Sequence, residues 1–201
     1  MPLSLMIIDD FLEKPDAFRQ TALGLNYPDL KGEFPGRNSA QRIDLPGLSQ
    51  HVSSLVGENL RPIDPMESHG HCRLTLASDP RLGAVHVDSA QWSGILYLSR
   101  DQDARGGTDF FRHKKTGLDQ IPINDREAGR LGYASSKAVM DQTVFADGKK
   151  RSAWEKTMSI PLRFNRLILL RPWLFHSSGP GFGSSVADGR LIYVMFFTLN
   201  R

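Results

Sequence analysis

Cysteine is nearly absent from this sequence: Cys72 is the only one among 201 residues. A chain with a single cysteine cannot form an internal disulfide. Small secreted domains usually depend on disulfides, whereas proteins of reducing compartments usually lack them. We therefore expect a cytoplasmic protein, and at this length one with a proper apolar core.

Long apolar runs are absent as well. The apolar run at residues 3–8 is short, ends at Asp9, and has no basic residue before it. It therefore fits neither a signal peptide nor a membrane span. Internal repeats, low-complexity tracts and clear linkers are also missing, so we expect residues 1–201 to form a single domain.

The chain also lacks a strong excess of one charge sign. The formal net charge is +3, and charged residues make up 23% of the chain, as in an ordinary soluble globular protein. Basic residues gather at 112–115 and 149–151, but neither cluster is large enough to predict a nucleic-acid-binding surface. We interpret both clusters as solvated loops and expect neither a nucleic-acid nor a membrane partner.

The N-terminal part is predicted to contain one strand and two helices. The strand covers residues 3–8. Pro15 suits the first turn of a helix, and Gly24 is a typical helix end. Leucines and valines at helical spacing predict a second helix over residues 48–60.

From residue 71 onward the pattern changes to short runs that are typical of β-strands. Turn residues such as Gly106-Gly107 separate them. Eight such strands behind helices predict a mostly β fold with N-terminal helices, namely a two-sheet jelly roll (double-stranded β-helix) that could hold a metal near one mouth. The expected strands cover residues 71–77, 83–87, 91–98, 107–112, 157–161, 165–170, 174–177 and 190–199.

One stretch interrupts the series of strands. Residues 113–156 are rich in Gly, Asn, Asp, Ser and charge, with weak helical signals at 124–131 and 136–145. A connection of this length is usually functional or disordered. We interpret it as an insertion beside the mouth of the site, where a lid and a surface excursion are both open.

His86, Asp88 and His176 are the candidate metal ligands. Residues i and i+2 of a strand point to the same face, so His86 and Asp88 can reach one ion while Val87 turns into the apolar layer. Two imidazoles and one carboxylate leave positions open on a metal, which is typical of non-haem Fe(II) oxygenases. A tripeptide His-x-Asp is a weak motif by itself, and an ordinary surface pair would look the same.

The order of motifs along the chain resembles a known family. The motifs are "LMIIDDFL", "HVD", "GILYLS", "GGTDFF", "RLILLRPWLFHSSGPG" and "GRLIYVMFF". This series is similar to the prolyl-4-hydroxylase-like branch of the Fe(II)- and 2-oxoglutarate-dependent dioxygenases. The resemblance extends in order from Leu5 to Phe197.

The resemblance implies roles for individual residues. His86, Asp88 and His176 match the iron ligands of the family. Arg190 matches the basic residue that pairs with the distal carboxylate of 2-oxoglutarate, and the planar guanidinium suits a carboxylate because it can donate two parallel hydrogen bonds. Arg190 also begins an apolar strand, where an unpaired charge would be costly.

The sequence departs from the family around the co-substrate. Ile192 stands where many relatives have a hydroxyl residue. Many relatives also have a tyrosine upstream of His-x-Asp; here Thr75 is the nearest hydroxyl, with Arg73 nearby. We take Arg190 and Thr75 as the candidate co-substrate residues, and we interpret Gly106-Gly107-Thr108 as a turn and strand start without chemistry of its own.

Other polar residues have simpler interpretations. Ser89 and Ser177 flank the candidate ligands and could orient them. A second pair of histidines, His69 and His71, has no evident carboxylate partner, and we expect it at the surface or at a strand end.

The predicted protein is thus an oxidoreductase with Fe(II) and 2-oxoglutarate as cofactors. We expect a hydroxylase that acts on a C–H bond of a small molecule, an amino acid or a peptide. Three alternatives stay open: oxidative demethylation of a nucleic acid or protein, a jelly-roll protein that binds a metal or small acid without turnover, and a sensor. Retention of all three ligand residues together with Arg190 favours an enzyme.

Overall fold

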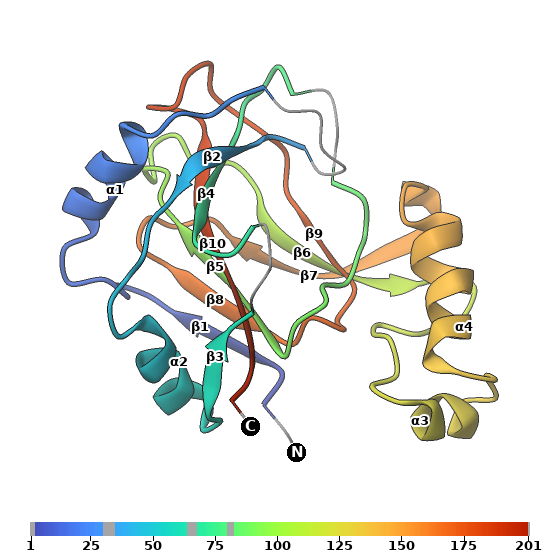
Figure 1. The fold of residues 1–201 in the computed structure, drawn as a ribbon. Helices are drawn as coiled ribbons and strands as arrows, with labels where there is room; N and C mark the ends of the chain where they lie inside the picture. Colours follow the sequence, from blue (N-terminus) through green and yellow to red (C-terminus); the bar gives the residue numbers. More distant parts are fainter. Residues whose placement is uncertain (1–2, 30–34, 64–67, 80–82, 201) are drawn as a thin grey trace.

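A computed structural model describes residues 3–29, 35–63, 68–79 and 83–200 of the protein. Its centre consists of two antiparallel sheets (Figure 1). The large sheet has the order β1-β8-β5-β10-β4-β2, with β3 paired to β10, and the small sheet has the order β7-β6-β9. Their bounds are β1 Leu5–Ile8, β2 Arg37–Arg42, β3 Leu60–Pro62, β4 His71–Thr75, β5 Trp92–Tyr97, β6 Gly107–His113, β7 Trp154–Pro161, β8 Leu167–Leu170, β9 His176–Ser178 and β10 Arg190–Leu199.

Strand β10 shows how the large sheet separates two apolar layers. Its odd-numbered residues from 191 to 197 belong to the layer that contains helix α1 (Pro15–Leu23) and helix α2 (Leu48–Val56). Its even-numbered residues from 190 to 196 line a cavity that lies between side chains of both sheets. Because alternate residues of a strand point to opposite faces, Arg190 at the start of β10 must face this cavity.

A second apolar cluster joins the two sheets. It combines Tyr97, Ile168 and Ile192 of the large sheet with Phe110 and Ile160 of the small sheet. Two antiparallel sheets packed face to face, with α1 and α2 on the outer side of the large one, form the jelly roll that the strand pattern predicted. The prediction of a mostly β fold with N-terminal helices is therefore confirmed.

Several predicted bounds differ from the structure. The second helix ends at Val56 and not at residue 60, because Gly57 adopts a left-handed conformation with φ of 70° and stops it. Leu60 then begins β3, and its N–H donates to Ser53 Oγ at 2.9 Å. Strands β2 and β3 were not predicted, because β2 has only one apolar residue, Ala40, and β3 has three residues.

The predicted strand at residues 83–87 is also absent. The segment is extended, but its backbone N–H groups are divided between two segments, one at Gly148 and one at residues 172–176, and do not follow one partner strand. Val85 donates to Gly148 O and Asp88 donates to Pro172 O. Only His86 makes a β-bridge, with His176.

The predicted insertion at residues 113–156 overlaps both flanking strands, since His113 ends β6 and Trp154 begins β7; residues 114–153 connect the two and form a helical layer beside the small sheet (Figure 1). They contain α3 (Asp125–Arg130) and α4 (Ser136–Met140), which agree with the predicted helical signals, followed by the π-helical turn η1 (Asp141–Phe145) and the 3-10 turn η2 (Arg151–Ala153). The interpretation of residues 112–115 as a solvated loop holds for Lys114 and Lys115, which are exposed in a turn, but was wrong for the two residues before them. Arg112 and His113 end strand β6, and the His113 side chain is fully buried.

Within the described residues, no helix has both the length and the apolar composition needed to cross a membrane.

Candidate metal centre

His86 and His176 lie directly opposite each other on neighbouring extended segments. The His86 N–H donates to His176 O at 2.9 Å, and the His176 N–H donates to His86 O at 3.1 Å. Side chains of directly opposed residues in an antiparallel pair lie on the same face. The two imidazole rings therefore meet, with their centroids 4.4 Å apart.

Asp88 completes a compact group of three side chains. Its Oδ1 lies 3.6 Å from His86 Nε2, and its Oδ2 lies 3.4 Å from His176 Nε2. One potential ligand atom from each of the three residues lies within 4.8 Å of the other two. The structure thus brings the three candidate ligands together, although they come from distant parts of the sequence.

Backbone carbonyls determine which nitrogen of each imidazole carries hydrogen. His86 Nδ1 lies 2.9 Å from Ala84 O, and His176 Nδ1 lies 2.8 Å from Leu174 O. A carbonyl can only accept, so each Nδ1 must donate, and the neutral ring then has its lone pair on Nε2. Both lone pairs face Asp88, an arrangement that needs a proton or a cation among the three groups.

The electrostatics of the group agree with this need. Burial and the charge of His176 lower the pKa of His86 to about 4, so this imidazole is neutral at pH 7. Burial alone would lower the pKa of His176, but Asp88 outweighs burial and raises it. Burial alone would raise the pKa of the Asp88 carboxyl, but the two histidines and Ser93 lower it, so Asp88 is ionised.

Ser93 on β5 orients the carboxylate. Its buried hydroxyl donates to Asp88 Oδ2 at 2.6 Å, which leaves Asp88 Oδ1 toward His86. The sequence analysis missed Ser93, because nothing in an apolar strand marks which serine will meet the aspartate. Of the two flanking serines, Ser177 is buried and donates to Gly83 O at 2.8 Å, whereas Ser89 is exposed.

Next to the three residues lies a cavity of about 150 Å³ between the two sheets. It is polar at one end and apolar along the β5 and β10 wall. Its lining residues include Arg73, Thr75, His86, Asp88, Ser93, Ile95, Thr108, His176, Ser178, Arg190, Ile192, Val194 and Phe196.

Arg190 contributes a buried cation to this cavity. The residue is 1% exposed, and its Nη2 donates to Gly107 O at 3.3 Å. Its Nε has no hydrogen-bond partner among the described residues. Burial lowers the pKa of the guanidinium. The guanidinium lies over the Tyr97 ring, with Arg190 Cζ 6.0 Å from the ring centroid.

Two hydroxyls accompany Arg190. Thr75, which the sequence analysis named, pairs with Arg190 across β4 and β10 and lines the cavity. Thr108 also lines the cavity, and its Oγ1 lies 2.7 Å from the Tyr97 hydroxyl. The Gly-Gly-Thr element therefore does more than begin a strand, since its threonine reaches the cavity.

The second histidine pair lies elsewhere. His69 Nδ1 accepts from the Phe196 N–H at 2.8 Å, and His71 begins β4 with its Nδ1 2.6 Å from Ser39 O. In the described ranges neither histidine belongs to a group of three metal-binding side chains.

Comparison with known proteins places the chain in a family. The model of the family of unknown function DUF6445 matches residues 2–197. The chain belongs to this family. A curated Ribonuclease PH from Synechococcus sp. (strain CC9605) is 27% identical over 128 residues, which are 63% of this chain and 49% of that protein. The DUF6445 chain thus spans about half the length of this curated relative.

Solved structures were compared with this DUF6445 protein, and one of them shares its fold. The non-heme alpha ketoglutarate dependent carbocyclase SnoK from nogalamycin biosynthesis superposes with a TM-score of 0.52 at 13% identity, over 96% of this chain and 79% of SnoK. Iron-bound HygX from Streptomyces hygroscopicus has a TM-score of 0.49 at 13% identity, over 98% of this chain and 82% of HygX. The likeness to SnoK supports the jelly-roll assignment.

Proposed function

We propose that this DUF6445 protein is an Fe(II)- and 2-oxoglutarate-dependent oxygenase. One observation carries the proposal: His86, Asp88 and His176 converge at a cavity that also contains the buried cation Arg190. Each part alone has an ordinary structural explanation. Together they supply a metal site and an anion site within one enclosed space.

The donor set fits a ferrous ion. Two neutral imidazole nitrogens and one carboxylate, with no other acid or histidine among the described lining residues, would leave positions on the metal open. This combination favours non-haem Fe(II) over a closed structural zinc site, which usually has four protein ligands. Ser93 and the carbonyls of Ala84 and Leu174 hold the three ligands in the orientation that binding needs.

The surroundings of Arg190 fit a carboxylate. A buried guanidinium with one carbonyl partner and an unpaired Nε is costly unless an anion completes its hydrogen bonds. The distal carboxylate of 2-oxoglutarate would meet this need. Thr75 and Thr108 offer hydroxyls beside it. Ile192 also lines the cavity but has no hydroxyl, so these two threonines would take the place of the hydroxyl that many relatives have at that position.

The protein residues would supply geometry and exclusion of water. When bound, iron and 2-oxoglutarate supply the chemistry that couples oxidative decarboxylation to hydroxylation of a C–H bond. His86 and His176 would hold the metal through Nε2, and the Asp88 carboxylate would offset part of its charge. The apolar side chains of Ile95, Val194 and Phe196 in the cavity wall would limit access of water to the site.

The size of the cavity suggests the kind of substrate. A small cavity beside the ligands, which the co-substrate would share, suits a small molecule, an amino acid or one side chain of a peptide. We propose the prolyl-4-hydroxylase-like branch for this protein, because the motif order from "HVD" to "GRLIYVMFF" resembles that branch.

The test is formation of succinate from 2-oxoglutarate by the purified chain with Fe(II) and air, across a panel of amino acids, peptides and small metabolites. We expect turnover with at least one substrate class and loss of turnover in His176→Ala. Arg105→Ala, which changes an exposed arginine, is the matched control and should retain activity. Formaldehyde release would assign demethylation, and stoichiometric metal binding without succinate would favour a non-catalytic binding protein.

A further inference from the structure

Residues 113–156 are hydrogen-bonded to both histidine-bearing segments. Val85, the residue before His86, donates its N–H to Gly148 O at 2.9 Å. Phe175, the residue before His176, donates its N–H to Asp119 O at 3.0 Å. The insertion therefore holds the backbone immediately next to each proposed ligand.

Side-chain packing also connects the insertion to the two histidine-bearing segments. Val85 and Phe175 are both fully buried in one apolar cluster, where they meet side chains of the insertion and its flanking strands. Neighbouring residues of an extended chain point to opposite sides. Each segment thus packs one residue against the insertion and presents the next residue, His86 or His176, to the cavity. The other fully or largely buried members of this cluster are Phe111, Ile121, Val139 and Trp154.

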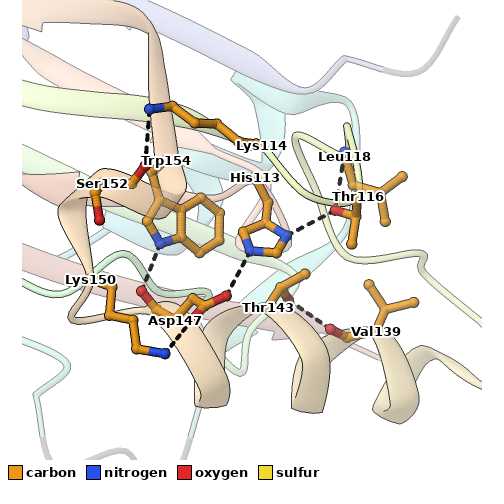
Figure 2. A network of polar contacts seen from close by, with 10 residues as sticks. All are labelled: His113, Lys114, Thr116, Leu118, Val139, Thr143, Asp147, Lys150, Ser152 and Trp154. Carbon is orange, nitrogen blue, oxygen red and sulfur yellow. Dashed lines mark hydrogen bonds and ion pairs between the residues drawn. The ribbon is translucent and has the colours of Figure 1, made fainter.

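Asp147 is the centre of a polar network that fastens the insertion (Figure 2). The Nε2 of the buried His113 lies 3.1 Å from Asp147 Oδ2, and Lys150 Nζ donates to Asp147 Oδ1 at 2.8 Å. The Trp154 indole donates to Asp147 O at 2.8 Å. The next residue is Gly148, whose carbonyl receives the Val85 N–H. The side chain and the main chain of Asp147 are therefore both held close to the contact with Val85.

Trp154 extends the network to the second ligand segment. Its ring centroid lies 4.8 Å from that of His113 and 4.9 Å from that of Phe175. His113 Nδ1 is held by Thr116 Oγ1 at 3.1 Å, which keeps Nε2 toward Asp147. A path of direct contacts thus leads from His113 to the backbone beside both proposed ligands.

Gly148 allows the close approach that this path needs. A Cβ at this position would lie 2.5 Å from Val144 O and 2.8 Å from Val85 O. Both are backbone atoms, which cannot yield as a flexible side chain can. Any larger residue would push the Val85 segment away.

We propose that His113 is a positioning residue for the metal ligands and that residues 113–156 brace the histidine segments. The identity of the bound metal rests on the proposed function; the mechanical coupling does not. A lid would be expected to contribute to the cavity wall. No described lining residue of the cavity comes from 113–156, whereas both ligand segments are bonded to it.

The first test is amide exchange in the metal-free protein, with His113→Ala and the milder His113→Gln, whose amide can still donate to Asp147. Loss of a hydrogen bond to a charged group corresponds to roughly a tenfold or greater change in the opening equilibrium. We expect the Val85 and Phe175 amides of His113→Ala to exchange at least about tenfold faster, with strands β5 and β10 unchanged. His113→Gln should recover part of the protection.

Lys137→Ala is the matched control. It removes an exposed ion pair with Asp141 in the same insertion, in which Nζ lies 2.7 Å from Oδ2. This variant should leave the exchange of Val85 and Phe175 unchanged. If Lys137→Ala raises the exchange rate of these two amides as much as His113→Ala does, then any change in the insertion has the same effect, and the role of His113 is overturned.

The second readout is affinity for Co(II), with the absorption spectrum of the bound ion as a report of ligand geometry. Removal of groups that orient metal ligands typically weakens metal binding by about 10- to 100-fold. We expect a weakening at the lower end of that range and a changed spectrum in His113→Ala, and neither in Lys137→Ala.

The outcomes separate the two proposals. Unchanged exchange at Val85 and Phe175 in His113→Ala overturns the brace, even if the parent binds metal. A parent that binds no metal overturns the proposed function, while faster exchange in the variant still supports the brace. If His113→Ala loses the slow exchange of β5 and β10 and so is unfolded, His113→Gln and Asp147→Asn decide in its place.

Discussion

At the scale of single residues, the alternation of side chains along β10 decides which way Arg190 faces. Leu191, Tyr193 and Met195 face the helices, so Arg190 faces the cavity although the strand is almost wholly apolar. The register with β4 then sets Thr75 beside it. Arg190 Nε has no hydrogen-bond partner among the described residues, and burial of an incompletely bonded cation costs free energy. A bound carboxylate would offset this cost.

Arg190→Ala should therefore weaken use of 2-oxoglutarate and leave metal binding nearly unchanged. Loss of a charge-assisted contact costs about 1.5–3 kcal/mol, which is roughly tenfold to over a hundredfold in affinity. The measurement is the 2-oxoglutarate concentration for half-maximal succinate formation, together with Fe(II) binding by titration. Equal use of 2-oxoglutarate by parent and variant would mean that another cation, such as Arg73, holds the acid.

At the scale of elements, the turn before β10 determines where Arg190 enters the sheet. The Asp188 carboxylate accepts hydrogen bonds from the Ser184 and Ser185 N–H groups and from the Ser185 hydroxyl, at 2.8 Å and 2.6 Å for the two Ser185 donors. These bonds, led by that of the Ser185 hydroxyl, lower the pKa of Asp188 to about 2. The ionised carboxylate thus stabilises the turn that precedes Arg190.

This turn predicts a pH dependence of stability. The folded pKa of Asp188 is depressed, so its contribution is fully present above the ordinary carboxyl pKa of about 4 and is lost as the pH falls through about 2. Asp188→Asn should be less stable than the parent at pH 7, and the difference should shrink between pH 4 and pH 2. Thermal unfolding of both proteins across this range is the measurement. A difference that stays constant down to pH 2 would contradict the prediction.

At the scale of the whole molecule, three apolar clusters leave a cavity where the two sheets meet. One cluster lies under α1 and α2, one joins the sheets, and one joins the small sheet to residues 113–156. The proposed metal site lies where segments from both sheets meet, so a ligand there connects parts of the fold that are far apart in sequence.

Metal binding should therefore stabilise the whole protein. A ligand that binds only the folded state at about 100 times its Kd contributes about 2.7 kcal/mol. For a chain of this size such a change corresponds to a rise in Tm of roughly 5–10 °C. We expect this rise with Ni(II) or Co(II), measured by calorimetry, and none in His176→Ala. An equal rise in the variant would mean that the metal binds elsewhere.

Much of the fold could be predicted from local pattern. Runs of alternating or apolar residues marked β4, β5, β6 and β10, because a strand buried in a sheet must be apolar on the face it packs. Pro15 and Gly24 marked the bounds of α1 for backbone reasons that need no tertiary contact. The spacing of His86 and Asp88, with the family resemblance, was enough to name the three candidate ligands and Arg190.

The rest depended on contacts between distant residues. Residues 83–87 resembled a strand, but the partners of this segment are divided between Gly148 and residues 172–176, and no local pattern specifies such partners. Ser93 and Thr108 reach the site only because β5 and β6 face each other across the cavity. The sequence around His113 predicted a solvated basic loop. In the structure this side chain is buried, because it contacts Asp147 and Trp154, which lie far along the chain. The sequence by itself thus determined which residues could do chemistry and which strands could form. Only the tertiary structure decided which groups orient and brace them, since hydrogen bonds between distant segments leave no periodic trace in the chain.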